Sequence, residues 1–153
     1  MHLKTEEAII QGCDGDKGAY LLHIELAKPR ELQIGRLGQR RFKRGHYVYA
    51  GSALNGLSAR IARHRRRTKK THWHVDYLLR DAILRSYRKV PSGERQECLL
   101  NSAVAEHAQA TMQVPGFGAS DCSCDSHLTH FERPPALRQF RAEPPADGVE
   151  KTA

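Results

Sequence analysis

One late segment of the sequence brings three potential metal ligands close together, Cys122, Cys124 and His127. Two thiolates and an imidazole could hold a soft cation such as Zn²⁺, with a fourth ligand from His130 or Cys98. The single residue between the two cysteines departs from the two-residue spacing that is common in zinc knuckles. A close-packed structural loop is at least an equal alternative, so the sequence alone does not favour zinc.

The sequence has four cysteines, and their arrangement is not typical of a disulfide framework. Cys13 and Cys98 are most simply explained as small buried hydrophobes. No apolar run approaches the roughly 20 residues of a membrane span. Glu6 and Glu7 interrupt the first ten residues, which argues against a secretory signal. We therefore expect a protein of the reducing cytoplasm, without a membrane partner.

Positive charge is concentrated in one block of the chain. Residues 36–89 contain 16 Lys and Arg against two Asp, whereas the whole chain has a net charge of +8. Such a block repels itself when the chain compacts, so a polyanion is its natural counterpart, and nucleic acid is the first candidate. A solvated, solubilising face is the alternative. The residues expected to contact nucleic acid are Arg63, Arg66, Arg67, Lys69, Lys70, His72 and His74.

The hydrophobic pattern predicts an α+β domain over residues 1–132, in which helices flank a small, mostly antiparallel sheet. Strands are expected at 19–26, around 32–34, at 45–50 and at 83–90, and helices from about 57, at 74–80 and at 94–109. Ser92 is the expected cap of the last helix. Residues 133–153 hold four of the seven prolines and are expected to form a disordered tail.

The helix from about 57 carries two distinct sets of side chains. Leu57 and Ile61 are spaced to face the core. Arg60, His64 and Arg67 recur at i, i+4 and i+7 and are expected on a different face. This face could present two cations and an imidazole to a ligand.

Five short segments also occur in a fixed order. They are Gly18-Ala19-Tyr20, Tyr49-Ala50-Gly51-Ser52, the pattern Leu57-x-x-Arg60-Ile61-x-x-His64, the segment 72–79 (HWHVDYLL) and the segment 117–128 (FGASDCSCDSHL). This ordered set resembles the GIY-YIG nuclease superfamily, and its last two segments resemble a small, poorly characterised branch of it. The resemblance covers residues 18–131, with Ala19 and Ala50 in place of the isoleucines that name the superfamily.

The resemblance implies roles for four residues. Tyr20 would help to position or deprotonate the attacking water, and Tyr49 would hold the nucleophile or the phosphate. Arg60 would contact the scissile phosphate, because a guanidinium matches phosphate oxygens bidentately. His64 would contact phosphate or assist proton transfer. A free phenol has a pKa of about 10, so Tyr20 needs a neighbouring positive charge to act as a base.

The resemblance also implies one divalent metal ion, Mg²⁺ or Mn²⁺, held by a glutamate of a late helix. Glu97 fits that setting best, with Glu94 and Glu106 as alternatives. A hard cation of this kind takes one or two carboxylates, and water and phosphate oxygens complete its shell. The resulting prediction is one metal ion bound by Glu97.

The function implied is hydrolysis of phosphodiester bonds by an endonuclease, with DNA preferred over RNA as the expected substrate. Structure-selective cutting, a role in DNA repair and a repair protein as a further partner are part of this prediction. Two alternatives stay open: a non-catalytic nucleic-acid-binding module on the same scaffold, and a zinc-stabilised interaction domain.

Taken singly, the candidate residues have simpler explanations. Tyrosines in strands usually pack in the core, and Trp73 is also expected there. His72 and His74 are expected to anchor the backbone first and to contact phosphate second. The nuclease prediction therefore requires that Tyr20 and the charged residues distant from it in sequence meet in one positively charged cleft.

Overall fold

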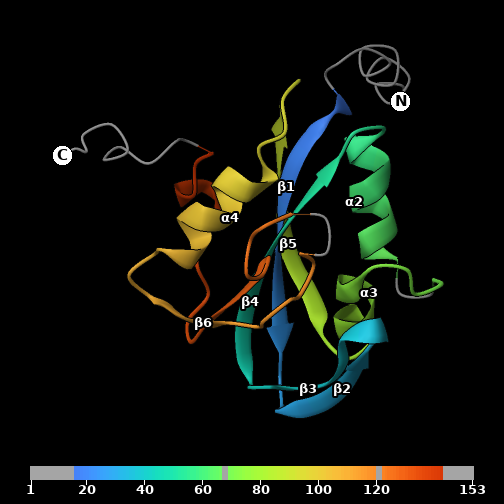
Figure 1. Cartoon of the computed structure of the whole chain (residues 1–153), viewed down its shortest axis with the longest axis vertical. Helices are drawn as coiled ribbons and strands as arrows, with labels where there is room; N and C mark the ends of the chain where they lie inside the picture. The colour runs from blue at the N-terminus through green and yellow to red at the C-terminus, as the bar shows by residue number, and fades with distance from the viewer. Residues whose placement is uncertain (1–15, 67–68, 120–121, 143–153) are drawn as a thin grey trace.

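The computed structural model describes residues 16–66, 69–119 and 122–142. Its main sheet has five antiparallel strands in the order β5-β1-β4-β7-β6. These strands are β1 (Gly18–Leu26), β4 (Gly45–Ala53), β5 (Ile83–Pro91), β6 (Ala110–Gln113) and β7 (Leu128–Phe131). A separate hairpin lies at one end of the sheet (Figure 1), and it consists of β2 (Arg30–Ile34) and β3 (Gly38–Phe42).

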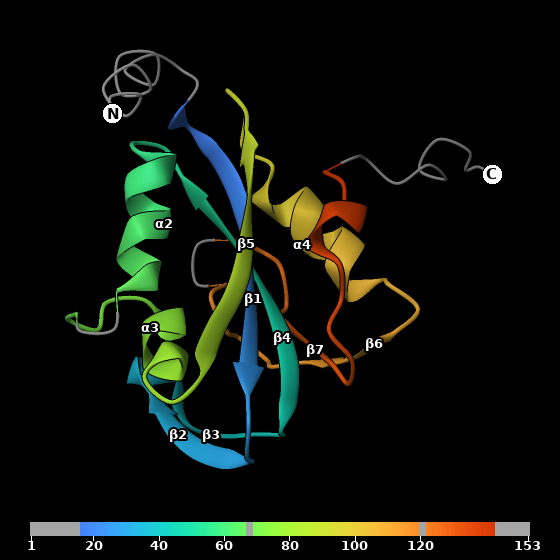
Figure 2. The same ribbon diagram turned by 180° about the vertical axis from the view of Figure 1, so that it is seen from behind.

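Helices cover both faces of the main sheet. α2 (Leu57–Arg65) and α3 (His74–Leu79) lie on one face, and α4 (Glu97–Ala105) lies on the other (Figures 1 and 2). This arrangement confirms the predicted α+β fold, with an antiparallel sheet flanked by helices. Among the described residues, none of the helices is both long enough and apolar enough to cross a bilayer.

The central strand β1 supplies side chains to two hydrophobic cores, because successive residues of a strand point to opposite faces. Tyr20 and Leu22 belong to the core shared with α2 and α3, whereas Ala19 and Leu21 belong to the core shared with α4. All four are almost fully buried. The unbroken apolar run in this part of the sequence is explained by this burial on both sides.

The structure adds three strands that the sequence pattern does not predict, β3, β6 and β7, and it shortens the last helix at both ends. Ser92 does not cap that helix. Its hydroxyl oxygen accepts a hydrogen bond from the Glu94 N–H (3.0 Å) and so closes a turn before the helix begins. The helix ends early because the His107 ring accepts the Gln109 N–H (3.1 Å) and the His107 carbonyl accepts the Ala110 N–H (3.0 Å). These bonds turn the chain into β6.

Residues 133–142 pack against the domain, although the sequence pattern places them in a disordered tail. Leu137 and Phe140 are buried, and the Phe140 ring lies 6.1 Å from the Phe131 ring, measured between centroids. Arg88 donates a hydrogen bond to the Leu137 carbonyl (3.1 Å). Two large apolar side chains thus hold a proline-rich segment on the α4 face. Residues 143–153, the rest of the predicted tail, lie outside the described residues.

Candidate active site

A cavity of about 400 Å³ lies where α2, the start of α3 and the start of α4 approach β1 and β4. We call it the cleft. The residues that line it include Tyr20, Tyr49, Arg60, Trp73, Glu97 and Gly118. Four of the five residues to which the resemblance assigns a catalytic role therefore share one cavity, and each of the four comes from a different element.

Glu97 reaches the cleft although α4 packs on the opposite face of the sheet. β7 pairs with β4 along residues 46–49, and Ala50 bonds His127 just before β7, so residues 51–53 of β4 project beyond them. Gly51, in this projecting part, lines the cleft together with Glu97, the first residue of α4. The first turn of α4 thus lies at the uncovered edge of β4. From there the Glu97 carboxylate faces the same cavity as the hydroxyl groups of Tyr20 and Tyr49, and 15% of the Glu97 side chain is exposed.

Two glycines give the phenols room. Tyr20 pairs with Gly51 in the β1–β4 register, and a Cβ at Gly51 would lie 2.5 Å from the Tyr20 hydroxyl oxygen. Gly118 has a φ of +68°, and a Cβ there would lie 3.0 Å from the Tyr49 ring. The Gly118 N–H donates to His74 Nδ1 (2.8 Å), so His74 anchors this backbone. Burial lowers the pKa of His74, which favours the neutral, accepting ring.

Tyr20 and His64 form a buried hydrogen-bonded pair. The Tyr20 hydroxyl oxygen lies 2.8 Å from His64 Nε2, and each residue is only 2% exposed. Burial lowers the pKa of His64 to about 4. Burial also raises the pKa of Tyr20 to about 12, although the Arg60 charge opposes that rise. At neutral pH the phenol is therefore protonated and the imidazole neutral, so the hydroxyl donates to Nε2.

The position of His64 in α2 differs from the prediction. His64 is buried together with Leu57 and Ile61, because i, i+4 and i+7 share one face of a helix. Its Nδ1 atom is buried and has no hydrogen-bond partner among the described residues. The prediction that His64 lies on a face separate from these two apolar residues was wrong. Arg67, which was expected beside it, lies outside the described residues.

An aromatic ring and a backbone carbonyl hold Arg60 in place. Arg60 Nη1 donates to the Ser52 carbonyl (2.8 Å), and the guanidinium carbon lies 4.3 Å from the centre of the Trp73 ring. The Arg63 guanidinium carbon lies 4.5 Å from the same ring centre. Trp73 was expected in the core, yet it is only partly buried and lines the cleft. Its ring fixes a guanidinium at the cleft wall by a cation–π contact.

Arg63, predicted to contact nucleic acid, is engaged inside the protein. Its Nη1 and Nη2 atoms lie 3.0 Å from the two oxygens of Asp76, whose side chain is fully buried. Asp76 also accepts the backbone N–H groups of His72 and Trp73 (2.8 Å each). This bidentate pair therefore fixes the segment that places Trp73 in the cleft. Asp76 was not predicted as part of the site, although it is one of only two acids within residues 36–89.

Replacing Asp76 by asparagine is expected to lower the free energy of unfolding by about 3 kcal/mol at pH 7, because Arg63 is left without its partner. Burial alone would raise the pKa of Asp76, but hydrogen bonds from Arg63 and from two backbone N–H groups hold that pKa below its usual value. Because the pKa of Asp76 is lowered by folding, its ionised carboxylate stabilises the fold at pH values above the unfolded-state pKa of about 3.9. This stabilisation is lost as the pH falls through the folded-state pKa.

The difference in unfolding free energy between wild type and Asp76→Asn should therefore shrink in acid. Urea unfolding at pH 7 and near pH 3 measures it. The exposed acid Asp81 provides the control, and Asp81→Asn is expected to change stability by less than about 0.5 kcal/mol. Equal effects of the two substitutions would contradict the structural role of Asp76.

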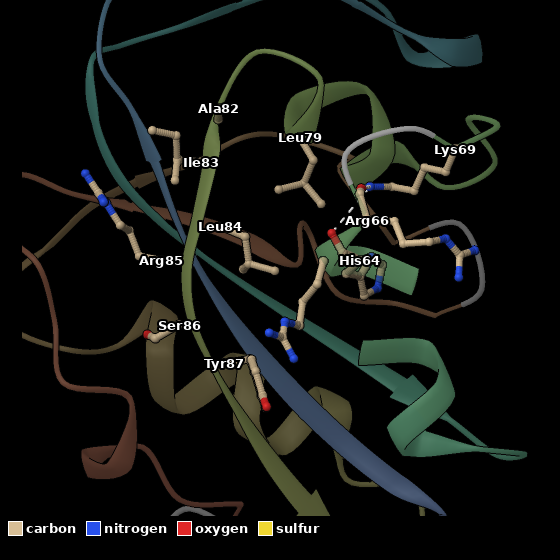
Figure 3. A pocket seen from close by; sticks show the side chains of 11 residues that line it. His64, Arg66, Lys69, Leu79, Ala82, Ile83, Leu84, Arg85, Ser86 and Tyr87 are labelled. Carbon is tan, nitrogen blue, oxygen red and sulfur yellow. Dashed lines mark hydrogen bonds between the residues drawn. The ribbon is translucent and has the colours of Figure 1, made fainter. Parts of the chain in front are cut away.

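A second cavity, of about 530 Å³, lies between the end of α2, α3 and β5 (Figure 3). Arg66 and Lys69 line it, and the Lys69 ammonium donates to the carbonyls of Arg66 (2.7 Å) and His64 (3.3 Å). The Arg65 guanidinium carbon lies 5.7 Å from the centre of the Tyr87 ring on β5. We call this cavity the basic pocket. Among the described residues no carboxylate lines it, so it offers cations and an aromatic ring without a ligand for a hard metal ion.

His64 connects the two cavities. It lines the basic pocket, while its ring is hydrogen-bonded to Tyr20, which lines the cleft. Of the other residues predicted to contact nucleic acid, Arg66, Lys70 and His72 are exposed. His72 also lines the cleft.

The late cysteines and histidine form one cluster. Its members, whose ligand atoms all lie within 4.8 Å of one another, are Cys98, Cys122, Cys124 and His127. This set could hold a metal ion. His130, the other residue considered as a fourth ligand, instead contacts the Thr111 hydroxyl (2.7 Å) and the Arg44 carbonyl (2.9 Å) through its two ring nitrogens. Cys13 lies outside the described residues.

Comparison with models of known families matches residues 19–144 to a family described as a domain of unknown function, DUF123. The match includes every residue of the cleft, the cysteine–histidine cluster and the packed segment 133–142. No curated protein and no solved structure matches the chain.

Proposed function

The chain belongs to the DUF123 family, and we propose that it is a metal-dependent endonuclease of the GIY-YIG type that hydrolyses phosphodiester bonds in DNA. The observation that carries this proposal is the presence of Tyr20, Tyr49, Arg60 and Glu97 around one cavity. These residues come from β1, β4, α2 and α4. Their meeting is therefore not a by-product of the periodicity of a single strand or helix.

The carboxylate of Glu97 fits a hard divalent cation. Its oxygens lie 3.8 Å from Arg95 Nη2 and 3.7 Å from His127 Nδ1, and both separations exceed a normal hydrogen bond. The lone pairs are thus not consumed by a close ion pair among the described residues. Mg²⁺ and Mn²⁺ are commonly held by one or two carboxylates together with water and phosphate oxygens. A bound ion would act as a Lewis acid on the charge that develops at the phosphate.

Arg60 supplies the cation for the scissile phosphate. A guanidinium has five N–H donors, and the Ser52 carbonyl takes one of them, so others can reach phosphate oxygens in the cleft. The contact with Trp73 limits the motion of the side chain before substrate binds. This preorganisation means that little reorganisation is needed as charge develops on the phosphate.

Tyr20 and His64 are suited to pass on the proton of the attacking water. A pKa of about 12 means that Tyr20 does not act as a free phenolate at neutral pH. Its hydroxyl already donates to the neutral His64 ring, so its oxygen can accept a hydrogen bond from a water in the cleft. As that water attacks phosphorus, its proton passes to Tyr20 and the phenol proton passes to His64 Nε2. The relay leaves an imidazolium, which the nearby phosphate anion stabilises.

The positive charge around the cleft favours a polyanionic substrate. Arg66 and Lys70 are exposed near the end of α2, and the basic pocket lies on the other side of the buried His64 from the cleft. A DNA backbone that contacts both cavities would place one phosphate beside Arg60 and neighbouring phosphates on these cations. The same surface also suits a non-catalytic nucleic-acid-binding module, which is the alternative function.

The experiment that separates these functions uses the purified chain with flapped, nicked, branched and plain duplex DNA. We expect cleavage in Mg²⁺ or Mn²⁺, no cleavage in EDTA, and binding that weakens steeply with added salt because phosphate contacts release counterions. Salt-dependent binding without cleavage of any substrate in either metal would favour the non-catalytic module. If the chain neither binds nor cleaves any of these DNAs, both functions are excluded.

A further inference from the structure

The cysteine–histidine cluster has the separations of a tetrahedral metal site. Cys122 Sγ lies 3.3 Å from His127 Nε2, and Cys98 Sγ lies 3.9 Å from the same nitrogen. With zinc bonds of about 2.3 Å to sulfur and about 2.0 Å to nitrogen, tetrahedral sulfur and nitrogen ligands stand about 3.5 Å apart. The two observed separations lie on either side of that value. At these two contacts, only small side-chain adjustments are needed to place an ion.

His127 presents the correct nitrogen to the thiols. Its ring is fully buried, and Nδ1 lies 3.0 Å from the Ala50 carbonyl oxygen. Because a carbonyl only accepts hydrogen bonds, Nδ1 carries the proton and Nε2 carries the lone pair. Histidines that bind metals usually donate their second ring N–H in this way, which fixes the tautomer and the ring orientation. The Ala50 contact therefore prepares Nε2 as a ligand.

Backbone hydrogen bonds hold the loop that carries the other ligands. The His127 N–H donates to the Phe117 carbonyl, and the Gly116 N–H donates to the Asp125 carbonyl (2.7 Å each). Asn101 on α4 donates to the Ser126 carbonyl (2.7 Å) and so ties the loop to the helix. Contacts that do not depend on an ion thus fix the end of the loop, at residues 125–127, and its position relative to α4.

We propose that Cys98, Cys122, Cys124 and His127 bind one Zn²⁺ ion, which clamps the first turn of α4 to the 122–127 loop. With all four positions filled by protein, the site is of the closed, structural kind. Thiolates are soft ligands and select zinc rather than the hard cation that a carboxylate takes. Binding converts the three thiols to thiolates and releases their protons to solvent.

The clamp has a consequence for the cleft. Glu97 directly precedes Cys98 on α4, and its Oε2 atom lies 3.7 Å from His127 Nδ1. A metal ion on Cys98 and His127 would therefore limit the motion of the Glu97 carboxylate relative to β4. The zinc site itself does not depend on the proposed nuclease function, whereas this consequence rests on it.

Elemental analysis of the purified full chain tests the site without any substrate. We expect one zinc ion per chain, and we expect Co²⁺ exchanged into the protein to give the absorption of a tetrahedral thiolate complex. Wild-type protein that holds less than about a tenth of an ion per chain and gives no Co²⁺–thiolate absorption would overturn the proposal, whatever the variants do.

Matched substitutions in the same loop identify the ligands. Cys122→Ser is expected to lower the zinc content about tenfold or more, and Ser123→Ala, at the exposed position next to it, is expected to leave the content unchanged. Retention of a full zinc complement by Cys122→Ser would overturn this ligand set. Glu97→Gln should also keep its zinc. If Glu97→Gln keeps its zinc but does not cleave, the loss is due to the cleft and not to the zinc site. If the protein cleaves DNA without bound zinc, the zinc proposal fails and the nuclease proposal stands.

Discussion

Replacing Glu97 by glutamine is expected to reduce the rate of DNA cleavage about a thousandfold or more, while DNA affinity changes by less than about threefold. Glutamine keeps the size of the side chain and removes the negative charge that a divalent cation needs. The side chain lies at the edge of the cleft with no close ion pair among the described residues, so the fold should tolerate the change. Single-turnover cleavage and equilibrium binding, measured in Mg²⁺ on the same substrate, separate the two effects.

Two other glutamates close in sequence provide the controls. Glu94 and Glu106 are exposed, and neither lines the cleft. Glu94→Gln and Glu106→Gln carry the same chemical change and are expected to cleave within about twofold of wild type. Wild-type cleavage by Glu97→Gln, or an equal loss in all three variants, would show that the metal ligand has been assigned incorrectly.

The choice among these three glutamates illustrates what the sequence could and could not predict. A helix here was predictable, but its start was not, because Ser92 closes a turn instead of capping the helix. Glu97 reaches the cleft only because β7 leaves the end of β4 uncovered. Tyr49 and Leu128 pair although 79 residues separate them in the sequence. Such a pairing depends on tertiary structure and cannot be predicted from local periodicity.

The strand tyrosines were easier to place. Tyr20 lies in a continuous apolar run, and the pairing of Tyr20 with Gly51 agrees with the order of the two tyrosine motifs in the sequence.

The position of Trp73 was predicted incorrectly. A tryptophan in the sequence looks the same whether its ring packs in the core or lies beneath two guanidinium groups. Its cation–π contacts with Arg60 and Arg63 depend on Asp76, whose buried side chain holds Arg63 in position. The available signal of this arrangement was that Asp76 is one of only two acids within the basic block of residues 36–89.

The packed segment 133–142 shows that average composition alone does not predict whether a segment packs on the domain. Prolines and charges dominate its average, but Leu137 and Phe140 are buried, and together with the Arg88 hydrogen bond to the Leu137 carbonyl they hold it on the sheet. The position of His64 has a related cause. Polar residues are usually placed on the exposed face of a helix, whereas His64 is buried because it hydrogen-bonds Tyr20 across the core. Both cases depend on partners that are distant in the chain.

Replacing Arg60 by alanine is expected to lower kcat/KM for DNA cleavage by about a hundredfold to a thousandfold, because the phosphate loses a charge-assisted, bidentate partner in the cleft. Arg60→Lys keeps the charge and loses the planar fork, so it should recover only part of this loss and remain at least about tenfold below wild type. Arg138→Ala removes an exposed arginine that lines neither cavity and should cleave normally.

A structural role of Arg60 must be separated from its role towards phosphate, since the same guanidinium also contacts Trp73 and the Ser52 carbonyl. Thermal unfolding of each variant measures the first role. Single-turnover cleavage over a range of enzyme concentrations, whose initial slope gives kcat/KM, measures the second. If Arg60 acts on the phosphate, Arg60→Lys will unfold close to wild type yet cleave slowly. If cleavage instead follows stability across the alanine and lysine variants, Arg60 serves only to position Trp73, and the cation beside the phosphate must come from another residue that lines the cleft, such as Arg95.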